Sequence, residues 1–114
     1  MGGFPAPFVQ AGLSQRNADP PVPISAHFAA WQLVVTFDRL LQPAEVLATN
    51  WFFRIANASY GIRAAEAIGS TIVLSAEPDE GDLGPDIVTY DATVPDVLSL
   101  AGTPATAFYN FPIT

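Results

Sequence analysis

The chain has 114 residues, of which half are hydrophobic and only 13% are charged, about half the charged share of an ordinary soluble domain. It contains no lysine and no cysteine, and eleven acidic residues against four arginines give a net charge of −7. This composition argues against nucleic-acid binding, which needs clustered basic side chains, and excludes a disulfide framework or a thiolate site.

So little surface charge indicates that neighbouring subunits cover part of the protein. The alternative is a monomer whose composition is simply rich in alanine and proline. The first residues lack the basic and apolar regions of a secretory signal, and no apolar run approaches the roughly eighteen residues of a membrane helix. We therefore expect assembly in the cytoplasm and no contact with a membrane.

Residues 1–23 form a segment that differs from the rest of the chain. They hold five of the eleven prolines and three of the eight glycines, which favours extended backbone. Apolar side chains interrupt the segment, and these are Phe4, Phe8, Val9 and Leu13. We predict an extended N-terminal arm whose four apolar side chains contact another protein. Folding back over an edge of its own sheet is the alternative.

The body, residues 24–114, begins with two short alternating runs. Ile24, Ala26 and Phe28 alternate with polar or small residues, and Leu33, Val35 and Phe37 do so after a short break. A period of two places one face of each strand inside, so the pattern predicts an antiparallel hairpin.

The next elements follow from proline position and β propensity. Pro43 predicts the first turn of a short helix that ends before Asn50. Residues 51–55 then form a strand, in which Trp51 and Phe53 share one face while Phe52 points to the other, and residues 57–59 turn. Because Phe52 leaves the core, we predict it at a protein interface.

The second half of the body predicts three or four more strands. Residues 63–68 are interpreted as a strand despite their alanine and glutamate, because Gly69-Ser70 and residues 71–74 complete a hairpin. Residues 77–84 predict an acidic loop, and residues 85–91 predict a strand with Val88 and Tyr90 inside. Val97, Leu98 and Leu100 are expected to pack a capping loop before a last strand at residues 108–113. Six or seven strands at this spacing predict an antiparallel β-sandwich.

Catalytic residue patterns are scarce. His27, the only histidine, falls on the outward side of the first strand without a placed nucleophile. The carboxylates of Asp79, Glu80 and Asp82 could offer oxygens to Ca²⁺, but the EF-hand spacing is absent and a solvated turn is the commoner arrangement. We predict no enzyme activity and no catalytic, cofactor-binding or metal-binding residues.

The aromatic residues allow two interpretations. An exposed set would stack on sugars, as in a carbohydrate-binding module, whereas a buried set would fill the core and subunit contacts. The residues concerned are Trp31, Trp51, Phe52, Phe53, Tyr60, Tyr109 and Phe111.

Short motifs within residues 23–112 resemble a known family. They include Leu33-Val34-Val35-Thr36-Phe37, Leu41 with Pro43, Asn50-Trp51-Phe52, Gly69-Ser70-Thr71-Ile72-Val73-Leu74 and Val88-Thr89-Tyr90. In this order they are similar to the bacterial Ig-like domains of surface-layer and swarming-type repeat proteins. The resemblance implies an Ig-like sandwich. Since repeat proteins of that kind carry tandem domains behind a signal peptide, a single domain with an arm looks more like those among tailed-phage structural proteins.

By analogy with such proteins, we expect a virion structural protein that decorates or cements a capsid. Its partner would be the major capsid protein, bound through the arm and a sandwich edge, with self-association as a small homo-oligomer. The alternative function is a carbohydrate- or receptor-binding adhesin module of a phage tail or bacterial surface.

Overall fold

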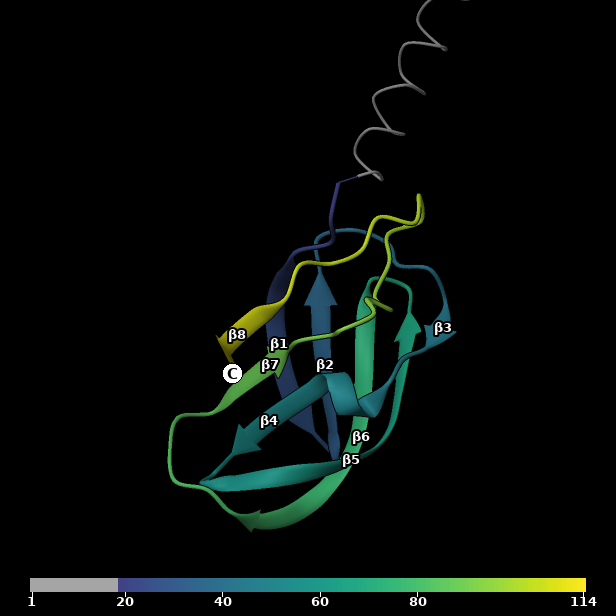
Figure 1. Cartoon of the computed structure of the whole chain (residues 1–114). Helices are drawn as coiled ribbons and strands as arrows, with labels where there is room; N and C mark the ends of the chain where they lie inside the picture. Colours follow the sequence, from purple (N-terminus) through teal and green to yellow (C-terminus); the bar gives the residue numbers. More distant parts are fainter. Residues whose placement is uncertain (1–18) are drawn as a thin grey trace, which may run out of the picture.

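The computed structural model describes residues 19–114, which are built almost entirely from strands (Figure 1). A single 3-10 turn, η1 (Ala48–Asn50), interrupts them. The strands are β1 (Pro23–Ala29), β2 (Gln32–Phe37), β3 (Ala44–Glu45), β4 (Trp51–Ile55), β5 (Ala58–Ile68), β6 (Thr71–Gly81), β7 (Ile87–Tyr90) and β8 (Phe108–Pro112). Every pairing between them is antiparallel.

The strands form one sheet in the order β1-β2-β6-β5-β4-β7-β8, with β3 paired to β5. The sheet folds over on itself, because the long strand β5 pairs with β6 along its length but with β4 only near its start. The two ends of the sheet approach each other, and Thr114 N donates a hydrogen bond to Ala26 O in β1 at 2.9 Å. This arrangement confirms the predicted all-β antiparallel sandwich.

Aromatic rings from the two layers meet in the core. Phe28 of β1 lies 5.9 Å from Phe53 of β4, and Phe37 of β2 lies 6.2 Å from Phe108 of β8, measured between ring centroids. Every second side chain of β2 and β6 points inward, because side chains alternate between the two faces of a strand. These inward side chains fill the space between the aromatic rings. The fully buried members are Leu33, Val35, Ile72 and Leu74, and Val88 of β7 and Val97 of the loop before β8 are also fully buried.

Most predicted strands are confirmed. Residues 63–68 belong to β5, where their backbone pairs with β6 and outweighs the helical preference of alanine and glutamate. The hairpin turn at Gly69 and the inward positions of Val88 and Tyr90 are also as predicted. The turn expected at residues 57–59 lies at Ala56 and Asn57, both in the left-handed region, because β5 already begins at Ala58.

The prediction that Ile24 lies inside was wrong, because β1 contains a bulge. Pro23 pairs with Phe37 and Ser25 with Thr36, so Ile24 is an extra residue without a partner on β2. A bulge of this kind turns the extra side chain away from its expected face. Ile24 is therefore exposed, while Ala26 keeps its inward position.

Three further predictions were wrong. Pro43 does not start a helix, because Ala44 and Glu45 pair with Ala67 and Glu66 of β5, and only η1 is helical. Most of the expected acidic loop is strand, since β6 continues to Gly81 against the start of β5. Of the predicted capping residues, Val97 is buried but Leu100 is exposed, because Leu100 lies in the turn that the hydrogen bond from Gly102 N to Ser99 O closes.

Candidate binding surfaces

Apolar side chains gather at the end of the molecule that carries Asp19, the first described residue. Backbone hydrogen bonds of 2.9 Å join Asp38 N to Val22 O, Leu41 N to Gly69 O and Gln42 N to Leu98 O. They bring the start of β1, the segment after β2, the β5–β6 hairpin and the loop before β8 to one end (Figure 1). Four exposed side chains from these segments form what we name the arm-end surface: Val22, Leu40, Ile68 and Leu100.

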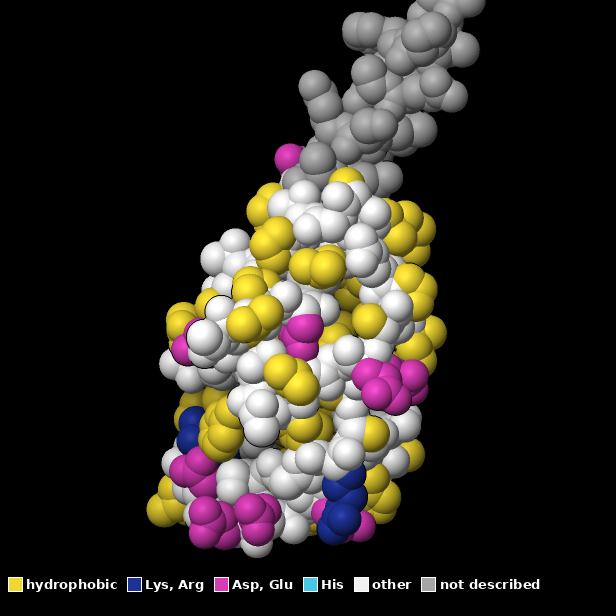
Figure 2. All heavy atoms as spheres, turned by 45° about the vertical axis from the view of Figure 1, so that its right-hand side comes forward, with side chains coloured by type: hydrophobic (Ala, Val, Ile, Leu, Met, Phe, Trp, Pro, Cys, Tyr) yellow, Lys and Arg dark blue, Asp and Glu magenta, His cyan; other side chains and the backbone are white. Residues whose placement is uncertain are grey.

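Charged side chains are concentrated at the opposite end. The second half of β6 and the loop that follows carry five of the eleven acidic residues, and these are Glu77, Asp79, Glu80, Asp82 and Asp86. Figure 2 shows hydrophobic side chains over the whole of this face, with most of the charged groups in the half away from Asp19. We name this end, opposite the arm-end surface, the acidic end; the exposed apolar side chain of Leu83 also lies on it.

The start of β1 is fastened to the end of β2 by a cluster of polar groups. Asp38 Oδ1 accepts hydrogen bonds from Val22 N at 3.0 Å and from Arg39 Nε at 2.8 Å. Arg39 Nη1 donates to the carbonyl oxygen of Asp19 at 3.4 Å. The hydrogen bond from Arg39 is the main cause that lowers the pKa of Asp38 to about 2. This cluster fixes where the arm joins the domain.

Replacing Asp38 by asparagine tests the cluster. A carboxyl whose folded pKa of about 2 lies below its usual 3.8 stabilises the fold above about pH 4, and this contribution is lost as the pH falls through about 2. At pH 7 we expect Asp38→Asn to lower the free energy of unfolding by about 1 kcal/mol, and near pH 2 we expect wild type and variant to converge. Urea unfolding at both pH values measures this, with the exposed Asp79→Asn as control. Equal stability at pH 7 would refute the role of Asp38.

A hollow of about 600 Å³ lies beside this cluster. The segment from Pro20 to Pro23 and Arg39 form one wall, and Phe108 and Phe111 of β8 form part of the other. Pro21 is fully buried, so the last residues of the arm are packed against the domain. The hollow extends the arm-end surface toward β8.

Phe52, the predicted interface residue, lies on the outer face of β4. Its side chain is 40% exposed, whereas Trp51 and Phe53 are buried, which confirms the predicted opposite faces. Phe52 pairs with Thr89 of β7, away from the arm-end surface. Whether Phe52 contacts a partner stays a prediction. The other predicted interface residues, Phe4, Phe8, Val9 and Leu13, lie outside the described residues.

The aromatic residues divide between the two interpretations. Trp51 and Phe53 belong to the core, and Tyr60 and Phe111 pack against it. Trp31, Phe52 and Tyr109 are exposed. A hydrogen bond with Asp91 raises the pKa of the Tyr109 hydroxyl.

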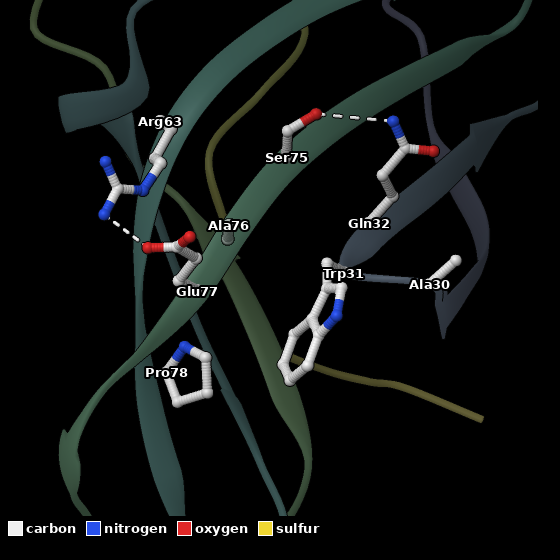
Figure 3. A pocket seen from close by; sticks show the side chains of 8 residues that line it. All are labelled: Ala30, Trp31, Gln32, Arg63, Ser75, Ala76, Glu77 and Pro78. Carbon is white, nitrogen blue, oxygen red and sulfur yellow. Dashed lines mark hydrogen bonds and ion pairs between the residues drawn. The ribbon is translucent and has the colours of Figure 1, made fainter.

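Trp31 borders a second hollow, of about 640 Å³, on the side of β6 (Figure 3). It lies in the two-residue turn between β1 and β2, and its carbonyl oxygen accepts a hydrogen bond from Ala76 N at 3.0 Å. Gln32 Nε2 donates to Ser75 Oγ at 3.4 Å, and the guanidinium of Arg63 pairs with the carboxylate of Glu77. An exposed indole and several hydrogen-bonding side chains thus share one open groove, which we name the Trp31 groove.

Other polar groups have structural partners. His27 is exposed, and its Nδ1 lies 2.8 Å from the carbonyl oxygen of Thr114. Arg54 binds Asp82 at 3.1 Å and the carbonyl oxygen of Pro85 at 3.0 Å, and it packs against Gly84, where any side chain would collide with it.

Within residues 19–114, no three His, Cys, Asp or Glu side chains gather in a metal-binding group.

Comparisons with protein-family models, curated proteins and solved structures give no match for this chain. None of the helical segments in residues 19–114 is long and apolar enough to span a membrane.

Sequence reasoning missed the arm-end surface, and it named Trp31 only as one of seven aromatic residues that would stack on sugars if exposed. The arm-end surface joins Val22, Leu40, Ile68 and Leu100, which are far apart in the chain and meet only through the backbone hydrogen bonds described above. The sequence did contain a sign of the Trp31 groove. Trp31 lies in the break between the two alternating runs, and a hairpin turn at such a break usually contains asparagine and glycine, not tryptophan.

Proposed function

We propose that this chain is a structural protein that decorates a protein lattice, of the kind that cements a tailed-phage capsid, and that its arm and arm-end surface face the lattice. Its partner is the major capsid protein, and its place is the outer surface of the virion. The role is one of binding and not of catalysis.

One observation carries this proposal: the four exposed apolar side chains of the arm-end surface lie where the arm meets the domain, at the opposite end from the acidic residues of β6 and the loop that follows. Apolar side chains at the centre of an interface gain free energy when a partner removes them from water. The acidic end suits a surface that stays in solvent, because like charges on neighbouring copies keep particles apart. An arm with Phe4, Phe8 and several prolines fits an extended segment that lies along a neighbouring protein.

Removal of residues 1–18 tests the proposal. The truncated chain keeps the buried Pro21 and the hydrogen bond from Val22 N to Asp38, so it should unfold cooperatively with nearly the same midpoint. We expect its affinity for capsids of the major capsid protein to fall at least about a hundredfold, since the arm supplies much of the contact. Co-sedimentation of both forms with capsids measures this.

Two results would contradict the proposal. If the truncated chain binds capsids as tightly as the full chain, the arm has no part in binding. If neither form binds capsids, the decoration role itself is refuted.

Glycan binding is the second candidate function. It depends on a separate observation, the exposed Trp31 in its groove, and the two functions do not compete for the same residues.

A further inference from the structure

Trp31 occupies a backbone position that is unfavourable for tryptophan. Ala30 and Trp31 form the two-residue turn between β1 and β2, with φ values of 53° and 63°. Turns of this shape prefer asparagine followed by glycine, and a bulky residue in the left-handed region is an outlier that the rest of the structure must hold in place. Strain of this kind is concentrated at functional sites.

Core packing does not account for the tryptophan. Its side chain is 57% exposed, and among residues 19–114 its ring contact is an edge contact with the half-buried Phe28, with 6.4 Å between ring centroids. The chain's other tryptophan, Trp51, is buried instead. The fold therefore places a large flat apolar ring at the surface at a cost to its own stability.

Hydrogen-bonding groups surround this ring. Figure 3 shows Trp31 on one side of β6 and the Arg63–Glu77 pair on the other, with Gln32 and Ser75 above and Pro78 below. Arg63 and Glu77 are both largely exposed, so their ion pair contributes little to stability and their remaining donor and acceptor sites face solvent. The groove, at about 640 Å³, has the size of a small-molecule site.

We propose that the Trp31 groove binds a neutral saccharide. The apolar face of a pyranose ring would stack on the indole, and its hydroxyl groups would bond to Gln32, Ser75, Arg63 and Glu77. The groove itself carries no net charge, since one guanidinium faces one carboxylate, while the whole chain carries −7 and repels anionic sugars. A proline-rich peptide is a poorer fit, because such peptides dock in grooves lined by several aromatic side chains and this groove contains one.

The test uses a variant that should improve the fold while it removes the site. Ala30→Asn with Trp31→Gly supplies the preferred turn sequence, so we expect the melting temperature to rise by about 3–5 °C. Titration of the full chain with cellohexaose, maltohexaose and chitohexaose should show binding of at least one, and the variant should bind it at least about tenfold more weakly. Trp31→Phe should keep part of the affinity. Tyr109→Ala, which removes an exposed aromatic ring elsewhere, should keep all of it.

Several results would overturn the proposal. These are binding of none of the three hexasaccharides, equal binding by the Asn-Gly variant, or binding only of an anionic oligosaccharide. Capture of a synthetic peptide of residues 1–18 in place of any sugar would also overturn it and would assign the groove to the arm of another copy. None of these results bears on capsid binding, so this proposal and the proposed function can fail separately.

Discussion

Aspartate in place of Leu40 or Ile68 is expected to weaken capsid binding at least about tenfold, and both substitutions together at least about a hundredfold. In the proposed complex both side chains leave water, and a carboxylate at either position would be buried without a partner. Because both side chains are exposed in the free chain, the free energy of unfolding should change by less than about 0.5 kcal/mol. Co-sedimentation with capsids and urea unfolding measure the two effects.

Leu83 provides the matched control. It is the most exposed large hydrophobic side chain among the described residues and lies in the loop after β6, at the acidic end. Leu83→Asp adds the same charge to the chain, and we expect it to change capsid affinity by less than about twofold. A similar loss for all three positions would point to net charge as the cause. No loss at Leu40 and Ile68 would remove the arm-end surface from the interface.

Asp96→Ala is expected to lower the free energy of unfolding by about 2–3 kcal/mol, the largest loss from a single polar side chain here. The Asp96 carboxylate accepts hydrogen bonds from Leu47 N at 2.7 Å and from the Tyr90 hydroxyl at 3.1 Å. Tyr90 is buried, so its hydroxyl would lose its acceptor away from solvent. Asp96 thus ties the segment before η1 to β7, and urea unfolding at pH 7 measures the loss.

Tyr90→Phe separates the two hydrogen bonds. It removes the hydroxyl, which donates to the Asp96 carboxylate and accepts from Asp96 N at 3.3 Å, but it leaves the bond to Leu47. We expect a loss of about 1 kcal/mol, clearly smaller than that of Asp96→Ala. Equal stability of Asp96→Ala and wild type would show that the hydrogen bonds of Asp96 add nothing to the backbone pairing with β5 that also holds the segment before η1.

The sequence predicted the fold class because the signal is local. Alternation in β2 and the aromatic run of β4 place Leu33, Val35, Trp51 and Phe53 inside, and these side chains are buried. A period of two specifies both the strand and the face that it buries. The strand pairing of residues 63–68 followed from the hairpin turn at Gly69, again a local feature.

Three of the four errors have a common physical origin, since each depends on pairing with another strand, and only the error at Leu100, which lies in a turn, does not. The bulge at Ile24 is defined by β2, and the strand character of Ala44 and Glu45 comes from β5. Pro78 and Gly81 are breakers by propensity, yet the partner strand β5 keeps them within β6. Local propensity contains none of this information.

The candidate surfaces were less predictable than the fold. Phe52 was placed correctly on the outer face because alternation within β4 decides it. The arm-end surface, in contrast, forms only where four separate segments of the folded chain meet. The sequence gives no sign of which exposed apolar residues become neighbours there. The four predicted arm residues, Phe4, Phe8, Val9 and Leu13, remain to be tested by the truncation.

The orientation of the chain on its partner tests the central claim most directly. Electron cryo-microscopy of capsids saturated with the full chain would resolve the sandwich and its two ends. We predict copies at regular lattice positions, with Val22, Leu40, Ile68 and Leu100 against the capsid and residues 77–86 toward solvent. Copies that present the acidic end to the lattice, or capsids that carry no regular density for the chain, would contradict the account.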